Sequence, residues 1–153
     1  FLDGPEEIVE ESIIFVNRDK LRSDIQIQNI STDYVVGIIS NEKLKEIKKS
    51  ENKVTQTINY RSSPIFQDPR SDKLGSRIIS NLEKLYLTIK KLSLHIQDNN
   101  DYFNNAHMAG VPVKNLKNLQ NNLFGLEENL EEFTAIDFKK GGYIGQENTA
   151  RVK

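Results

Sequence analysis

The alternation of helix-periodic segments with short strand-like runs constrains the fold of this chain more than any other feature. The longest helix is predicted to begin after Asn81, an N-cap residue, and to run to about residue 96. Its apolar side chains recur at steps of three and four residues: Leu82, Leu85, Ile89, Leu92 and Ile96. This spacing predicts one continuous buried helix face.

Three shorter helices are predicted from the residues at their ends. Asp3, followed by a proline and two glutamates, is a cap candidate for a helix that runs to about residue 18. Asn41 is expected to cap a lysine-rich helix over 42–49. A helix over 100–109 is expected to end at Gly110, because glycine favours the left-handed conformation after a helix.

The strand-like runs fall into two pairs and one late run. Alternating apolar residues predict a half-buried strand around 25–27, paired with a more buried strand at 34–39 across a turn at 31–33. Strands are also predicted at 54–60, 75–79 and 135–138, with Pro64 and the turn at 68–70 breaking the chain between the first two. Pairs adjacent in sequence predict an antiparallel sheet with helices on one face, an α+β fold. Residues 113–132 are expected to form a long polar connection.

Composition excludes several classes of site. The net charge of -1 excludes a strong overall field, so nucleic acid and an anionic membrane are not default partners, and no run of 18 apolar residues is present. The 153 residues contain no cysteine, which excludes disulfides, cysteine nucleophiles and thiolate-held metals or clusters within them. Two histidines, His95 and His107, are too few for a metal site and are interpreted as packed or exposed. A cytoplasmic location is expected.

A glycine-rich stretch near the end of the sequence, KKGGYIGQENTARVK at 139–153, is the main candidate site. Its glycines permit positive φ or a close approach of a ligand to the backbone. Gly145 is expected to open a helix in which Glu147 and Arg151 form an i,i+4 ion pair. The backbone N–H groups at that helix start, beside Lys139 and Lys140, could hold an anion. Residue chemistry alone leaves a plain turn and an anion site as open alternatives.

The segment KGGYIGQE, residues 140–147, resembles the K-G-C-Y-x-G-Q-E signature of the YgfZ family at seven of eight positions. This family consists of folate-binding proteins related to the T-protein (aminomethyltransferase) of the glycine cleavage system. Further segments resemble the family in the same order: DKLRSDIQIQNIS at 19–31, FQDPRSDKLGSRII at 66–79, AGVPV at 109–113 and FGLEENLEEFTAIDFKKG at 124–141. The resemblance therefore covers nearly the whole chain.

The resemblance implies a T-protein-like folate-binding fold, of which this chain is a central fragment without the C-terminal barrel. It divides the chain into the end of a first subdomain (1–40), a second α+β subdomain (41–112) and a connection that returns with the signature loop (113–153). The implied ligand-binding residues are Lys140, Gly141, Gly142, Tyr143, Gly145, Gln146, Glu147 and Arg151. Tyr143 is expected either to stack on a planar ring or to pack between domains, and Arg151 is expected to orient Glu147.

The implied function is that of a tetrahydrofolate-binding accessory protein in iron–sulfur cluster assembly or repair, with folate and iron–sulfur proteins or assembly factors as partners. No catalytic residue is assigned; if the protein is an enzyme, an aminomethyltransferase-like reaction is implied. A ligand-free interaction module is a further alternative. Two departures from the family favour it: Gly142 replaces the signature cysteine, and Met108 stands where the family has a carboxylate for the pterin. Ala106 replaces a nearby arginine of the family.

The Asp68-Pro69-Arg70 segment carries two interpretations. Asp followed by Pro is ordinary turn chemistry, and this interpretation is favoured. Alternatively, Arg70 and Arg77 face a central cavity, where they would meet the glutamate carboxylate of a folate.

Overall fold

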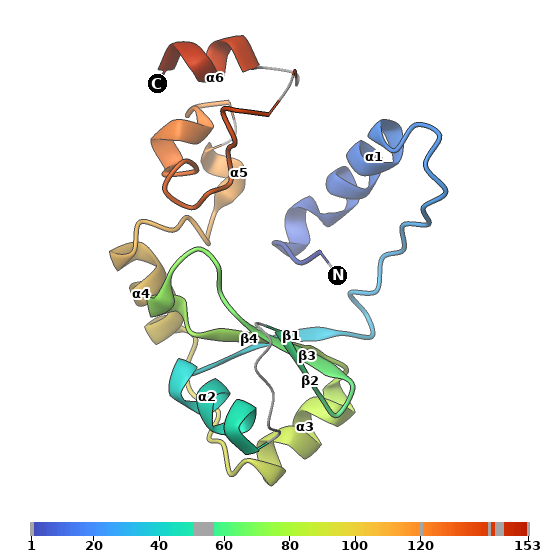
Figure 1. The fold of residues 1–153 in the computed structure, drawn as a ribbon, viewed down its shortest axis with the longest axis vertical. Coiled ribbons are helices and arrows are strands. Elements are labelled where there is room, and N and C mark those ends of the chain that lie inside the picture. The colour runs from blue at the N-terminus through green and yellow to red at the C-terminus, as the bar shows by residue number, and fades with distance from the viewer. Residues whose placement is uncertain (1, 51–56, 120, 141, 143–145, 153) are drawn as a thin grey trace.

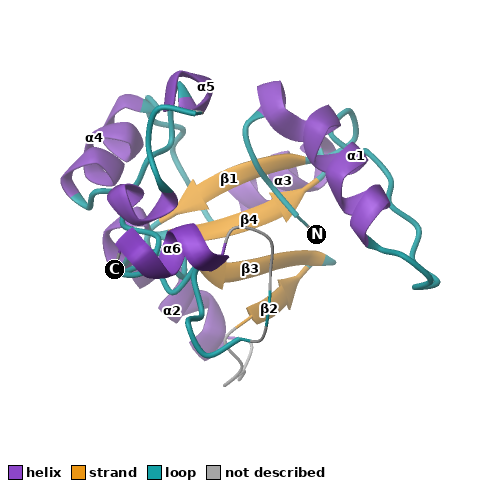
Figure 2. Ribbon diagram, turned by 90° about the horizontal axis from the view of Figure 1, so that it is seen from above, coloured by secondary structure: helices purple, strands orange, loops and turns teal. Residues whose placement is uncertain are grey.

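The protein is described by a computed structural model that covers residues 2–50, 57–119, 121–140, 142 and 146–152. A four-stranded antiparallel sheet lies at its centre, with strand order β1-β4-β3-β2 (Figure 2). The strands are β1 (Val35–Ile39), β2 (Thr57–Tyr60), β3 (Ser63–Gln67) and β4 (Ser76–Ser80). The helices are α1 (Val9–Asp19), α2 (Asn41–Ser50), α3 (Leu82–Lys91), α4 (Asn100–Met108), α5 (Leu116–Leu119) and α6 (Gln146–Val152). Short 3-10 helices occur at Glu6–Ile8, Asp72–Leu74 and Gly125–Glu128. The predicted α+β class, an antiparallel sheet flanked by helices, is confirmed.

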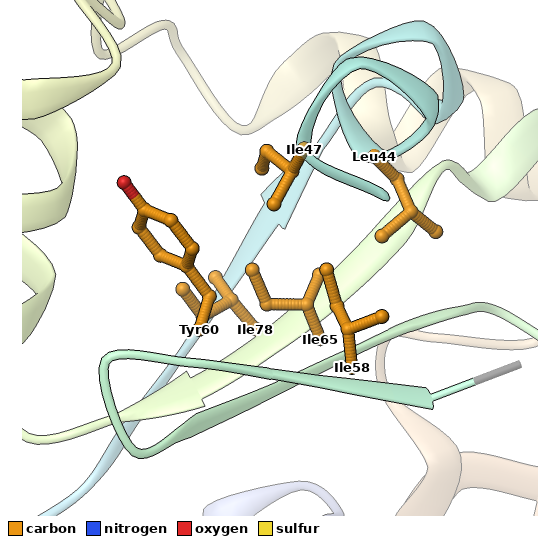
Figure 3. Close-up of a cluster of buried hydrophobic side chains, with 6 residues drawn as sticks. All are labelled: Leu44, Ile47, Ile58, Tyr60, Ile65 and Ile78. Carbon is orange, nitrogen blue, oxygen red and sulfur yellow. The ribbon is translucent and has the colours of Figure 1, made fainter. Parts of the chain in front are cut away.

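The main core lies between one face of the sheet and the helices α2 and α3, which both lie below it in Figure 1. Its buried members come from α2 and from β2, β3 and β4: Leu44, Ile47, Ile58, Tyr60, Ile65 and Ile78 (Figure 3). The strand residues share one face because Ile58 pairs with Ile65, and Ile65 pairs with Ile78. Helix α1 and the C-terminal segment with α5 and α6 lie on the other side of the sheet (Figure 1).

The strand β3 was not predicted, because Pro64 was interpreted as a chain break. Pro64 pairs with Asn59 of β2, whereas the pairing of β3 with β4 begins only at Ile65. Pro64 therefore lies outside the paired part of β3 and β4. Its missing N–H costs no hydrogen bond to β4, so the sheet tolerates a proline at this position. The β2–β3 hairpin turns through Arg61 and Ser62, whose φ angles of 52° and 65° match the twist that two-residue hairpins favour.

The predicted strand at 25–27 and its pairing with β1 are wrong. Residues 24–30 form no strand, and β1 pairs with β4, with Val35 opposite Ser80 and Ile39 opposite Ser76. The alternation at 25–27 fits a strand locally, but a strand also needs a neighbour. Among the described residues β1 has β4 as its only strand neighbour, and the segment instead receives a hydrogen bond from the Lys20 ammonium at the Ile25 carbonyl, at 2.9 Å.

The long helix α3 begins as predicted and ends earlier. The Asn81 side chain accepts a hydrogen bond from the Lys84 N–H at 2.9 Å, which confirms it as the N-cap. The helix ends at Lys91 because Ser93 adopts a positive φ of 51° and the Leu94 N–H donates to the Ile89 carbonyl, a Schellman-type ending. Ile96 therefore lies beyond the helix and is exposed. Leu82, the first residue of the helix, is exposed as well, so neither end of the predicted apolar face is buried.

Two other cap predictions are corrected. Helix α2 is capped by Ser40, whose Oγ accepts from the Lys43 N–H at 3.2 Å. Asn41 instead links α2 to the turn before β4, because it accepts from Ser76 Oγ and donates to the Asp72 carbonyl. Asp3 caps no helix, since Glu6–Ile8 has no side-chain cap and the Asp3 carboxylate binds Arg77.

A second, smaller core forms where α4 meets the segment before β4. Its buried residues are Leu74, Ala106 and Val111, with Tyr102 and Phe133 packed against them. Helix α4 ends as predicted: Gly110 has a φ of 69°, and the Val111 N–H donates to the Ala106 carbonyl at 2.8 Å.

The predicted connection at 113–132 contains α5 and the 3-10 helix Gly125–Glu128. The strand predicted at 135–138 is wrong, because this run lies between two tight turns. Thr134 has a φ of 55°, and the Asp137 side chain accepts from the Lys139 N–H. The division into subdomains at 40 and 112 stays a prediction. Within the described residues, no helix is long and apolar enough to cross a bilayer.

Candidate functional site

A pocket of about 400 Å³ lies where the N-terminal segment meets the turn after β3. Its lining comes from four separate parts of the chain: Asp3, Gly4, Pro5, Arg70, Arg77, Tyr102, Pro112, Val113 and Leu116. Arg77 projects from β4, and its neighbour across the sheet, Phe66, stands two residues before Asp68. The antiparallel pairing of β3 and β4 therefore brings the two arginines and Asp68 together.

Asp68 lies beneath this pocket and is fully enclosed, with no exposed side-chain surface. The backbone N–H and Nε of Arg70 donate to its Oδ1 at 3.0 Å each. The Oδ2 accepts from Arg70 Nη2 and from Arg77 Nε, both at 2.8 Å. A buried carboxylate with four donors and two guanidinium partners is fully satisfied and stays ionised.

The pKa of Asp68 reflects a contest between burial and hydrogen bonding. Burial raises it, but the hydrogen bonds from the Arg70 and Arg77 side chains and from the Arg70 backbone together outweigh burial and lower the pKa to about 2. In turn, the hydrogen bond to Asp68 raises the pKa of Arg70. Asp68 and Arg70 therefore stay charged at every pH at which cells operate.

The two arginines extend from this carboxylate to the pocket wall. Arg70 Nη2 and Arg77 Nη2 both donate to the Tyr102 hydroxyl, at 3.4 and 3.3 Å, and Arg77 Nη1 donates to Asp3. Arg77 is the more buried of the two, with 14% of its side chain exposed against 29% for Arg70. One part of the pocket wall is thus built from two guanidinium groups and one phenol hydroxyl.

Both interpretations of the Asp68-Pro69-Arg70 segment hold in part. The Arg70 N–H donates to the Asp68 side chain two residues before it, as in an ordinary Asx turn. Arg70 and Arg77 also line a pocket, as the second interpretation requires. The sequence alone did not predict that Tyr102 and Asp3 bind these arginines, because both residues are far from them in the chain.

The signature loop is described only in part. Lys140 and Gly142 are exposed, and a Cβ added at Gly142 would contact nothing within 4 Å. Gln146, Glu147 and Arg151 lie on α6 as predicted. Glu147 and Arg151 are both exposed and, within the described part of α6, form no ion pair, since two mobile exposed side chains gain little by pairing in water. Gly141, Tyr143 and Gly145 lie outside the described residues.

The loop and the arginine pocket do not share a wall among the described residues. None of the described loop residues lines the pocket, and α6 instead contacts the 3-10 helix Gly125–Glu128. Whether the predicted loop residues bind a ligand stays a prediction.

The two positions near the α4 end have different surroundings. Met108 is 79% exposed and presents a thioether rather than a carboxylate, so it supplies no strong acceptor for a pterin. Ala106 is fully buried in the second core with Leu74 and Val111, where an arginine would not fit. In the described part of the chain, no group of three or more His, Asp or Glu side chains is arranged to hold a metal ion.

No family model matches the chain. It is similar to a protein of Dictyostelium discoideum named iron-sulfur cluster assembly factor IBA57 homolog, mitochondrial, at 26% identity over 153 positions, or 99% of this chain and 37% of the relative. A protein of the same name from Mycosarcoma maydis is 30% identical over 152 positions, or 99% of this chain and 34% of the relative. A third, from Pyricularia oryzae, is 31% identical over 87 positions, or 57% of this chain and 22% of the relative. The chain thus spans about a third of the length of the first two, and its α+β fold is compatible with a piece of a T-protein-like protein.

Proposed function

We propose that the protein carrying this chain acts in iron–sulfur cluster assembly. The observation that carries the proposal is the similarity to two proteins named as assembly factors over 99% of this chain. Because the match is not confined to one motif, it includes the sheet, the arginine pocket and the signature loop.

The role proposed for this part of the protein is an accessory one. The chain has no cysteine, and its described residues contain no cluster of potential metal ligands. Thiolates are the usual ligands of iron–sulfur clusters, so a cluster would be held by other proteins or by other parts of the same protein.

We further propose membership of the YgfZ family and tetrahydrofolate as the ligand. The support is the signature segment at 140–147, which matches at seven of eight positions. The residues fit the ligand unevenly: Arg70, Arg77 and Tyr102 offer donors suited to a glutamate carboxylate, whereas Met108 offers no carboxylate to the pterin. Binding of the pterin would therefore fall to the loop residues 140–147.

Removal of the protein from its own cells tests the assembly role. We expect the activities of iron–sulfur enzymes to fall, while enzymes without a cluster keep their activity, and full-length protein supplied back should restore them. Lys140→Ala tests the signature, with Lys139→Ala as the matched control, because both lysines are exposed and adjacent. Equal rescue by both variants would show that the signature lysine is not required for the function. Unchanged activities of iron–sulfur enzymes after removal of the protein would reject the assembly role.

Titration of the full-length protein with tetrahydrofolate, followed by calorimetry, tests the ligand. Saturable binding that weakens in Lys140→Ala is expected. No binding at millimolar ligand would reject the folate proposal and leave the ligand-free interaction module. A Gly142→Cys variant then asks whether the missing thiol matters, by comparing its rescue of the depleted cells with that of the unchanged protein.

Location is proposed separately. The sequence predicted the cytoplasm, but the matched relatives are named mitochondrial, which favours a mitochondrial site of action. Fractionation of cells that express the tagged full-length protein decides between the two compartments.

A further inference from the structure

We propose that the outer side of the helices α2 and α3 binds an anionic lipid surface. Both helices pack on the same face of the sheet (Figure 1), and their other sides carry exposed side chains. This α2–α3 face consists of the residues of Asn41–Ser50 and Leu82–Lys91 that are not buried in the core. It differs from the rest of the molecule in its charge and in the apolar side chains that it exposes.

The α2–α3 face is positive although the whole chain is not. The two helices contain seven lysines and three glutamates, a net charge of +4, in a chain with a net charge of -1. Of these seven lysines, within the described residues, only Lys43 forms an ion pair, with Glu46 at 2.9 Å. The charges of the other six are therefore not neutralised by a described carboxylate. Lysines so placed attract an anionic membrane from within about a Debye length.

The balancing negative charge lies on the other side of the sheet. Residues 125–138 contain no lysine or arginine and five acidic side chains: Glu127, Glu128, Glu131, Glu132 and Asp137. This segment lies with α5 and α6, away from α2 and α3 (Figure 1). An anionic surface therefore attracts the α2–α3 face and repels the opposite side, so charge alone orients the molecule.

Helix α3 adds exposed apolar side chains to this charged face. Leu85 and Leu92 pack against the core, whereas Leu82 and Tyr86 lie one turn apart on the outer side and are 70% and 55% exposed. Leu87 is exposed beside them. The side of a helix that faces only water ordinarily carries polar residues. Leucine and tyrosine among lysines are instead typical of a helix that lies in a membrane interface.

Tyr86 and Lys90 form a pair suited to the headgroup region. The Lys90 Nζ lies 4.5 Å from the centroid of the Tyr86 ring. Tyrosine rings are enriched at the level of lipid headgroups, and a lysine can rest its apolar stem on such a ring while its ammonium group reaches a phosphate.

The hollows of the molecule lie elsewhere. Besides the arginine pocket, a second pocket of about 310 Å³ is lined by Ile8, Glu11, Ser12, Phe15, Leu116 and Lys117. Neither pocket is lined by a residue of α2 or α3. The charge of the α2–α3 face is spread over two helices outside both pockets, which favours an extended lipid surface over a small molecule held in a cavity.

Co-sedimentation of the full-length protein with lipid vesicles tests the proposal. The two probes are vesicles of phosphatidylglycerol and phosphatidylcholine in equal parts, and vesicles of phosphatidylcholine alone. We expect the protein to sediment with the first kind and not with the second. Binding should fall as salt is added, because counterions screen the lysines. Equal binding to both kinds, or no binding to the anionic vesicles, would overturn the inference.

Paired lysine substitutions separate the charge of this face from the charge of the chain. Lys90→Gln with Lys91→Gln should weaken binding to the anionic vesicles about twentyfold, because each lysine near such a surface contributes about fivefold. The matched control is Lys117→Gln with Lys139→Gln, two exposed lysines in the segment around α5 and α6. This control should change binding by less than about twofold, since its lysines face away from the membrane. Equal losses in the two pairs would contradict binding through the α2–α3 face.

Leu82→Ala tests the apolar contribution. It should weaken binding about fivefold, because it removes apolar surface that enters the interface. Leu123→Ala is the matched control, since Leu123 is 44% exposed and adjoins the acidic segment, and it should leave binding unchanged. Unchanged binding in Leu82→Ala would overturn the insertion of α3.

Poly-glutamate serves as the probe for an acidic protein in place of a membrane. Retention on poly-glutamate that is lost in Lys90→Gln with Lys91→Gln, together with no binding to anionic vesicles, would replace the lipid surface with an acidic protein partner. The vesicle assay measures neither cluster assembly nor tetrahydrofolate binding, so its outcome is independent of the tests of the proposed function.

Discussion

The region from β1 to α3 and the helix α1 both contain regularly spaced apolar residues, but they differ in how far they bury them. In the sheet region, Ile65 is 0% exposed and six residues form one closed core. In α1, no residue is buried, and Ile14 is 69% exposed although five of the eleven residues of the helix are apolar. Helical spacing thus predicts that an apolar face exists, but burial of that face depends on a partner surface. In the part of the chain that the structure describes, the sheet provides this surface for α2 and α3 and not for α1.

Replacement of Asp68 should give the largest difference between the two kinds of region. Asp68→Asn leaves two partly buried arginines without their shared carboxylate, and we expect a loss of about 3–5 kcal/mol in the free energy of unfolding. Asp137→Asn is the matched control, because both side chains accept from the N–H two residues on but Asp137 is exposed. Urea unfolding of both variants measures the difference, and equal losses would contradict the central role of Asp68.

Truncation of a core isoleucine tests the comparison directly. Ile65→Ala should destabilise by about 2–5 kcal/mol, because it opens a cavity in a closed core. The same change in α1, Ile14→Ala, should stay within about 0.5 kcal/mol. Thermal unfolding of the two variants provides the measurement. A large effect of Ile14→Ala would mean that α1 is packed in solution against a surface beyond the described residues.

Acid should weaken the sheet region through Asp68. Its folded-state pKa of about 2 lies below the ordinary 3.8, so its contribution to stability is complete above about pH 4 and is lost as the pH falls toward 2. The loss should amount to about 2 kcal/mol, since each unit of pKa difference corresponds to about 1.4 kcal/mol. Unfolding measured between pH 5 and 2 should show this slope in the unchanged protein and a smaller one in Asp68→Asn. Identical slopes would assign the acid sensitivity to other groups.

The smallest effect concerns a defect within the well-packed region. Thr88 is buried on α3, and its hydroxyl has no hydrogen-bond partner among the described residues. Thr88→Val keeps the shape and removes the unpaired hydroxyl, so we expect a gain of up to about 1 kcal/mol. Thr32→Val, in an exposed turn, should change the free energy of unfolding by less than that. A clear loss in Thr88→Val would show that the hydroxyl is satisfied in solution.

Sequence reasoning succeeded at two helix ends where the deciding contacts are local, although it missed the local turns that end α3 at Lys91 and that replace the strand expected at 135–138. The cap at Asn81 and the turn at Gly110 depend on residues within one helical turn, and both were predicted correctly. It failed where the deciding contact is distant: β1 was paired with the wrong segment, and Pro64 was interpreted as a break although the pairing with β4 starts after it.

The candidate site follows the same rule. The turn at Asp68-Pro69-Arg70 could be predicted from its residue types, and so could the possibility that Arg70 and Arg77 face a cavity. The contacts of these arginines with Tyr102 and Asp3 could not be predicted, because they join α4 and the N-terminal segment to β4 across long separations in sequence. The signature loop shows the opposite case. Its sequence is distinctive, but Lys140, Gly142 and Glu147 are exposed, and none of the described loop residues lines either of the two pockets.

The order of strands in the sheet has a kinetic consequence. The β2–β3 hairpin closes through a two-residue turn, whereas β1 reaches β4 only after the whole intervening chain has been placed, with Val35 opposite Ser80. Short loops close in well under a millisecond, and the entropy of closing a loop rises with its length. The hairpin and β4 should therefore assemble early and β1 should add last, so that pulsed hydrogen exchange during refolding would protect Ile65 before Val36.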